Sequence, residues 1–297
     1  MYSPAYLGDA LCKRQVLERL LSLQKADTWA MRPIYWDGRT GSLVGSLLQG
    51  ENLDEWERLF GLPKWLALAI DNLFASGPDL KAGLEFGIAL LDAIPVGADM
   101  RTVGSRVVIE LLEGLPCGLL PIVSMHAMTE TLISVSSLHR RITDGGDVDA
   151  AEWRAVRRRA VAQTDAVERG SVDADVGACI EAATWDPRTS RTAVSDTGRV
   201  WIKATSDAEV ARQSGWCAHD DERMKALLDR LHADAKAAGA TGFIDVFKLL
   251  DEKHPEEARQ LKAHIALEHA CRGAQWRKIT DLLLRVATEA GGAVKAA

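Results

Sequence analysis

The histidine–carboxylate pairs of this sequence have a spacing that could bind a metal ion or move a proton. His126 precedes Glu130 by four residues and His264 precedes Glu268 by four, so each pair would share one face of a helix. A zinc site needs three or four protein ligands, so each pair is at most half of a site. We therefore predict no metal site and no cofactor. We expect His269, on the apolar stripe of its helix, to be a core histidine.

A catalytic site assembled from distant segments is a second hypothesis for the function. The acids and histidines of the segments expected to be central are Glu85, Asp92, His126, Glu130 and His139. If these side chains met in one buried polar pocket, their pKa values would be perturbed, as is typical of active sites. The sequence contains no GxSxG elbow and no cysteine in a recognisable catalytic context. We therefore rank an enzyme behind a binding protein.

Residues 32–50 contain four glycines and one proline, which predicts a loop or a short hairpin. The segment lacks the Gly-Lys-Ser/Thr ending with which a P-loop holds phosphates and magnesium. A dinucleotide-binding loop would need a βαβ unit around it, and strand periodicity is absent here. We expect a loop packed by Tyr35 and Trp36. These two rings, together with Arg39, are candidate partner-binding residues.

Six arginines fall between Arg140 and Arg159, and three of them have helical spacing. On a helix that starts near Asp149, the side chains of Arg154, Arg157 and Arg158 would share the outward side. Such a surface could bind phosphates, nucleic acid or an acidic partner. The acids interleaved with it offset much of its charge: Asp144, Asp147, Asp149 and Glu152. Phosphate or nucleic-acid binding through the Arg140–Arg159 surface is therefore a third hypothesis.

The sequence holds nine tryptophans, and most of them fall at buried positions of predicted helices. Trp36, Trp185 and Trp216 instead lie in or beside predicted loops. Tryptophan is over-represented among the residues that dominate binding at protein interfaces. These three side chains are therefore candidate anchors for a partner.

Apolar residues recur at helical spacing from end to end of the chain, and period-two alternation is scarce. The clearest helix covers 218–238, with three acids in its first turn and Gly239 as its stop. We expect Asp99 to cap another helix that ends at Gly114, and Pro255 to begin a third. A separate last helix is expected to bury Trp276 and Leu283. The sequence therefore predicts an all-α protein, an irregular multi-helix bundle or a stack of helical hairpins.

The domain boundary, if there are two domains, should lie between 142 and 190. This region contains the turn at 144–147 and an apparently irregular segment at 184–198. We predict an N-terminal helical unit over 1–145 and a C-terminal one over 146–297, or a single continuous domain. A length of 297 residues allows either arrangement.

Composition and charge place the chain among globular proteins. Apolar residues make up 47% and charged residues 26%. The most apolar stretch, 115–138, contains Pro121, His126 and Glu130, so we expect a buried central helix there and no membrane span. No export signal is visible, and the five scattered cysteines suggest a reducing cytoplasm.

The net charge of −6 does not favour nucleic acid as a partner. Residues 1–148 carry 18 acids against 13 bases, an acidic half that suits a basic partner. The first hypothesis is therefore a protein-binding module of the immunity or adaptor type. Such a module would neutralise or recruit a partner protein with a basic surface.

Overall fold

The structure, a computed structural model, describes the whole chain except residues 1–2, 26–28, 116–117 and 292–297, and the side chain of Ala218. Helices make up 71% of it, in 13 α-helices, and the described residues form no β-strand. Isolated β-bridges pair Gly41, in the predicted loop, with Trp29 and with Trp36. The predicted all-α multi-helix fold is confirmed. No helix in the described ranges combines the length and the apolar character needed to cross a bilayer.

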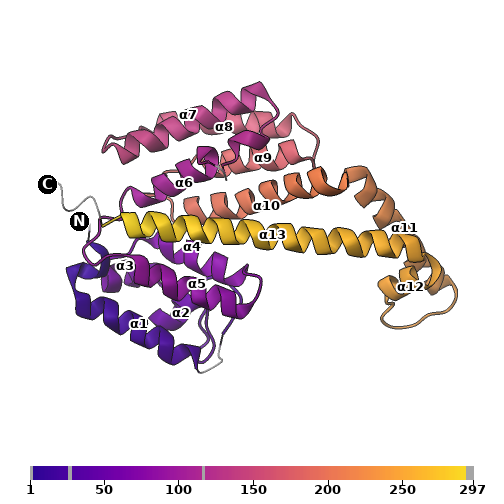
Figure 1. Cartoon of the computed structure of the whole chain (residues 1–297), viewed down its shortest axis with the longest axis horizontal. Helices are drawn as coiled ribbons and strands as arrows, with labels where there is room; N and C mark the ends of the chain where they lie inside the picture. Colours follow the sequence, from indigo (N-terminus) through magenta and orange to yellow (C-terminus); the bar gives the residue numbers. More distant parts are fainter. Residues whose placement is uncertain (1–2, 26–28, 116–117, 292–297) are drawn as a thin grey trace.

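The helices form two groups with two long helices between them (Figure 1). The first group comprises α1 (Ala10–Gln24), α2 (Leu43–Leu48), α3 (Leu53–Phe60), α4 (Lys64–Ala75) and α5 (Leu80–Ala93). The second comprises α6 (Val103–Glu113), α7 (His126–Thr143), α8 (Ala150–Asp165) and α9 (Val172–Ala182), and short 3-10 turns cover Ala5–Gly8 and Leu120–Ile122. The long helices α10 (Ala193–Ser214) and α13 (Pro255–Glu289) contact both groups.

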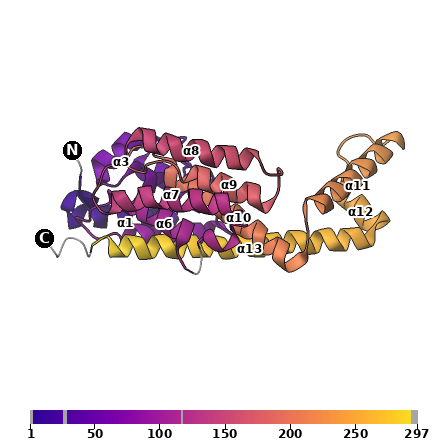
Figure 2. The same cartoon turned by 90° about the horizontal axis from the view of Figure 1, so that it is seen from above.

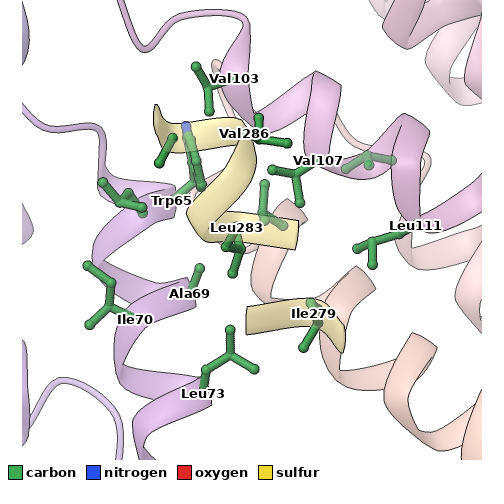
Figure 3. Close-up of a cluster of buried hydrophobic side chains, with 14 of the residues drawn as sticks. Trp65, Ala69, Ile70, Leu73, Val103, Val107, Leu111, Ile279, Leu283 and Val286 are labelled. Carbon is green, nitrogen blue, oxygen red and sulfur yellow. The ribbon is translucent and has the colours of Figure 1, made fainter. Parts of the chain in front are cut away.

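The main hydrophobic core forms where α13 packs between α4 and α6 (Figure 3). Each helix contributes one buried stripe, spaced by three or four residues. The stripes are Trp65, Ala69, Ile70 and Leu73 on α4, Val103, Val107 and Leu111 on α6, and Ile279, Leu283 and Val286 on α13. Residues on both sides of the predicted boundary at 145–146 belong to this core. The division into 1–145 and 146–297 stays a prediction about independent folding.

Side-chain caps mark the starts of several helices, and one expected cap is corrected. Asp149 caps α8 and, with Glu152, forms the reciprocal pair of hydrogen bonds known as a capping box. The helix expected after Asp99 begins only at Val103, with Thr102 at its N-cap position, because Asp99 instead pairs with Arg101 at 2.5 Å. Local caps therefore mark helix starts within a few residues.

Two segments depart from the sequence-based expectation. The apolar stretch 115–138 is not one buried helix: it contains a 3-10 turn, and α7 starts at His126, while residues 116–117 lie outside the described residues. The segment expected to be irregular over 184–198 is shorter, because α10 already begins at Ala193. The prolines and turn residues break the chain as expected, but the helices resume sooner after them.

The C-terminal part of the chain carries an arm, which we define as residues 215–270 (Figure 1 and Figure 2). It contains α11 (Ala218–Ala237), α12 (Val246–Lys253) and the first half of α13. The segments expected to form two helices from Pro255 and around Trp276 are one helix of 35 residues. At a rise of 1.5 Å per residue, α13 is about 50 Å long, so it joins the arm to the remaining described residues, the body.

The arm has its own small hydrophobic cluster, made of Met224, Leu231, Leu250 and Ala258. This cluster is far smaller than the main core, and long stretches of α11 are exposed on most sides. Few buried apolar contacts mean a low free energy of local opening. We therefore expect the arm to open at lower free energy than the body.

Replacing Leu231 with alanine tests this difference in local stability. Leu231 is 3% exposed, so the truncation removes a large part of the arm cluster. Backbone amides of α11 and α12 are expected to exchange hydrogen at least about 10-fold faster, while amides of α4 and α6 keep their rates. Hydrogen-exchange mass spectrometry measures both. An equal increase in α4 and α6 would show instead that arm and body open as one unit.

Candidate partner-binding surfaces

The glycine-rich segment 32–50 folds into a compact loop that leads into α2. Tyr35 and Trp36 are half-buried in it, and Arg39 is exposed. A Cβ at Gly45 would lie 1.9 Å from the carbonyl oxygen of Tyr35, so only glycine allows the loop to pass this close to α2. The loop is therefore a packed structural element, and Tyr35 and Trp36 offer only part of their rings to a partner.

A buried carboxylate, Asp71 of α4, anchors this loop. Its two oxygens accept hydrogen bonds from the backbone N–H groups of Ile34, at 2.8 Å, and Val44, at 2.9 Å. Burial raises the pKa of Asp71 to about 6, although the hydrogen bonds it accepts act in the opposite direction. Sequence reasoning missed this residue. Its signal is a lone acid within the apolar run of α4, KWLALAIDNLFA.

The structure brings together two candidate residues from separate parts of the sequence, Arg157 of α8 and Trp185 of the loop after α9. The guanidinium carbon of Arg157 lies 3.2 Å from the centre of the Trp185 ring. The same guanidinium donates hydrogen bonds to the hydroxyl and carbonyl oxygens of Thr184, at 3.1 and 2.8 Å. Desolvation by burial lowers the pKa of Arg157. Arg157 thus holds the loop, whereas Arg154 and Arg158 are exposed as predicted.

Acidic neighbours pair with the other arginines at the start of the Arg140–Arg159 surface. Arg140 pairs with Glu113 and Arg141 with Glu152, both at 2.5 Å. These exposed ion pairs contribute little stability, but they reduce the positive potential of the surface. Only part of the predicted basic surface therefore faces solvent as free guanidinium groups.

The candidates for a central catalytic pocket do not meet in one place. Glu85 and Asp92 of α5 are exposed, and His126 pairs with Glu130 at 3.2 Å on the exposed start of α7. His139 alone is buried. Within the described ranges, no three His, Cys, Asp or Glu side chains lie close enough together to hold a metal ion.

His139 joins four segments of the body. Its Nε2 lies 2.8 Å from the carbonyl oxygen of Ala183, and its Nδ1 lies 3.2 Å from the hydroxyl of Ser105. Because a carbonyl can only accept, Nε2 carries the proton and Nδ1 accepts from Ser105. Burial lowers the pKa of His139 to about 4, and its ring contacts Trp153 edge to face. The imidazole is therefore neutral at pH 7 and connects α7 to α6, α8 and the α9–α10 loop.

Trp216 lies at the base of the arm, packed against α13 instead of extending into solvent. Its ring stacks on His264 with 4.1 Å between the ring centres, and its Nε1–H donates to Asp221 at 2.8 Å. His269, which we expected in the core, is exposed. This expectation was wrong because α13 leaves the body before this turn, so no neighbouring helix covers that side. Trp216 therefore supports the arm and is only partly available to a partner.

The far end of the arm carries two exposed phenylalanines that sequence reasoning missed. Phe243 is 94% exposed in the loop between α11 and α12, and Phe247, in the first turn of α12, is 53% exposed. Gly239 and Gly242, both with φ of +87°, turn the chain immediately before Phe243. The signal in the sequence was a bulky aromatic directly after a glycine-rich turn, where no helical stripe could bury it.

Comparison with known proteins identifies no relative of this all-α protein with its projecting arm. No protein-family model matches the chain, and searches of curated proteins and of solved structures return no match. A function must therefore be inferred from the residues of the chain itself. Of the surfaces described above, the tip of the arm presents the most exposed aromatic side chain.

Proposed function

We propose that this chain is a binding protein that recruits or neutralises another protein through the tip of its arm. The observation that carries the proposal is the exposure of Phe243, at 94%, and of Phe247, four residues further along the chain, at 53%. Large apolar side chains grouped on a surface are typical of interaction sites. A partner that covers both rings would remove their apolar area from water, the dominant favourable contribution to most protein associations.

The position of the phenylalanines supports the same function. They belong to the loop between α11 and α12 and to the first turn of α12, and both helices are part of the arm that projects from the body (Figure 2). Phenylalanine has only two side-chain torsions to restrict on binding, which makes an aromatic anchor favourable in entropy. The arm therefore presents a small apolar contact that suits a pocket or groove on the partner.

The charge of the arm indicates which partner surface it fits. Residues 215–270 carry 11 acids and 8 bases, so the arm holds half of the net charge of −6 of the whole chain. Complementary charge raises the rate of association and contributes to specificity. The partner is thus a protein with an apolar pocket surrounded by basic residues.

Replacing both phenylalanines with serine is the test. The F243S/F247S variant is expected to bind the partner at least about 10-fold more weakly, because aromatic anchors at interface centres contribute 2 kcal/mol or more each. The partner is first trapped in the producing cells by a photoreactive amino acid at position 243. Its affinity for the wild-type chain and the variant is then measured by titration calorimetry at two salt concentrations.

The matched control is L21S, which changes an exposed apolar residue of α1, 49% exposed, in the body. It should leave the affinity within about twofold, since it lies outside the proposed contact. The photoreactive amino acid is also placed at position 21. Crosslinks that form equally from positions 21 and 243 would contradict the proposal. So would a partner that F243S/F247S binds as tightly as the wild-type chain does.

A further inference from the structure

A cavity of about 270 Å³ opens to solvent between α4, α10 and α13, beside the C-terminal end of α4. Its wall is mainly apolar: Ala69, Leu73, Ile202, Trp276 and Ile279. These side chains lie one or two turns apart on their helices, so each helix lines the cavity with one face. The cavity is distinct from the arm tip and from every candidate residue that the sequence suggested. Its size is close to the lower end of the range for small-molecule pockets.

Contacts within the protein hold the wall of the cavity in place. The indole Nε1–H of Trp276 donates to the carbonyl oxygen of Leu73 at 2.9 Å, and its ring meets Phe86 edge to face at 5.9 Å. A Cβ at Gly198 would lie 2.7 Å from Cδ1 of Ile279, so glycine lets α10 approach α13 closely here. Because these contacts fix the ring and the helix spacing, a ligand would enter a pre-organised pocket.

The rim of the cavity carries three cationic side chains, and two of them have no counter-ion among the described residues. Lys203 pairs with Asp175 at 2.6 Å and with Asp207 at 2.7 Å. Arg199 and Arg272 form no ion pair and no side-chain hydrogen bond with any residue in the described part of the chain. Two unpaired guanidinium groups above an apolar pocket attract an anion, since guanidinium geometry matches a carboxylate.

The neutral polar side chains at the rim each donate a hydrogen bond within the protein. The Asn72 amide donates to the carbonyl oxygen of Leu68 at 2.8 Å, and the Ser76 hydroxyl donates to that of Asn72 at 2.7 Å. The Ser195 hydroxyl donates to the carbonyl oxygen of Thr192 at 3.0 Å. The two arginines are therefore the cationic groups at the rim that lack an acceptor among the described residues, and a neutral or cationic head group would leave them unpaired.

We propose that this cavity binds a small amphiphilic anion: a carboxylate on an unbranched aliphatic body of about the size of octanoate. The apolar body fills the space against Trp276 and Ile202, and the carboxylate accepts hydrogen bonds from Arg199 and Arg272. Burial of the tail supplies most of the affinity, and the charge-assisted hydrogen bonds select the head group. This site is independent of the arm tip, so its outcome does not bear on the proposed function.

Octanoate and octylammonium below their micelle concentrations, and 1-octanol below its solubility limit, are titrated into the full chain by calorimetry. Octanoate is expected to bind at least about 10-fold more tightly than 1-octanol, and octylammonium more weakly than either. The R199M/R272M variant keeps the apolar stems but removes both charges. It should bind octanoate at least about 10-fold more weakly, while its affinity for 1-octanol changes by less than about threefold. Octanol bound as tightly as octanoate, or no octanoate binding at millimolar concentration, would overturn the proposal.

Two further variants show where the ligand binds. N72F places a ring into the cavity from α4 and should abolish octanoate binding, with folding checked by its thermal unfolding curve. R230M/R277M removes two exposed arginines that lie outside the cavity lining and form no ion pair with a described residue, and it should leave octanoate affinity within about twofold. Octanoate binding that survives N72F, or that R230M/R277M weakens as much as R199M/R272M does, would contradict the assignment to this cavity.

Discussion

Replacing Leu283 with alanine is expected to lower the free energy of unfolding by about 2–5 kcal/mol, the range for a buried leucine whose removal leaves a cavity. Leu283 is 2% exposed and lies where α13 packs between α4 and α6 (Figure 3). Three helices meet there, so the surrounding side chains can close the cavity only by moving whole helices. Urea unfolding followed by circular dichroism measures the loss.

The control for this prediction is L21A. Leu21 lies on α1 and is 49% exposed, so the same truncation removes little buried area and should cost under about 1 kcal/mol. If L283A lost less than about 1 kcal/mol, α13 would not be a central element of the body. The arm would then be joined to the body more loosely than the packing of α13 implies.

Replacing Asp71 with alanine is expected to cost about 2–5 kcal/mol at pH 7, because it leaves the buried N–H groups of Ile34 and Val44 without their acceptor. The loss of stability should appear first in the glycine-rich loop. Hydrogen exchange at these two amides, together with urea unfolding, measures both effects. Unchanged protection of the Ile34 and Val44 amides in D71A would contradict the anchoring role of this carboxylate.

The pH dependence of stability gives an independent check on Asp71. Burial raises its pKa from the ordinary 3.8 to about 6, so between these values the folded state binds more protons than the unfolded state. The contribution of Asp71 to the free energy of unfolding is therefore present near pH 4 and is lost as the pH rises through about 6. The loss is on the order of 3 kcal/mol. The stability difference between the wild-type chain and D71A should grow as the pH falls from 7 to 5. A constant difference would show an unshifted pKa.

Much of the secondary structure could be predicted because its causes are local. Asp149 with Glu152 specifies the start of α8, and Pro255 the start of α13, through hydrogen bonds and backbone angles within one turn. The buried stripe of Trp276 and Leu283 follows from helical periodicity alone. These features need no knowledge of the neighbouring helix.

How each helix packs against its neighbours was predicted less well, as α13 shows. Its apolar stripe changes neighbours along its length, from the arm cluster near Ala258 to the main core near Ile279. Between them His269 is exposed, so the periodic pattern weakens and suggests two helices. No proline interrupts this stretch, and Gly273 is tolerated within the helix. The backbone therefore continues as one helix although its buried face does not.

For the candidate residues too, the local structure was predicted and the packing was not. Tyr35, Trp36 and Trp216 were correctly placed in or beside loops, but each packs partly against its own surroundings. Whether any of the candidates binds a partner stays a prediction. Phe243 and the cavity lined by Trp276 were not foreseen, since exposure and empty space depend on which helices are adjacent.

The sequence by itself determined that the chain is helical, where helices such as α8 and α13 start, and which side of several helices is apolar, because these depend on interactions within one or two turns. Only the tertiary structure decided that Arg157 lies on Trp185, that Asp71 accepts a hydrogen bond from the backbone N–H of Val44, 27 residues earlier in the chain, and that an arm presents Phe243. Such contacts join residues that are distant in the chain. They arise from the packing of whole helices, which local periodicity does not encode.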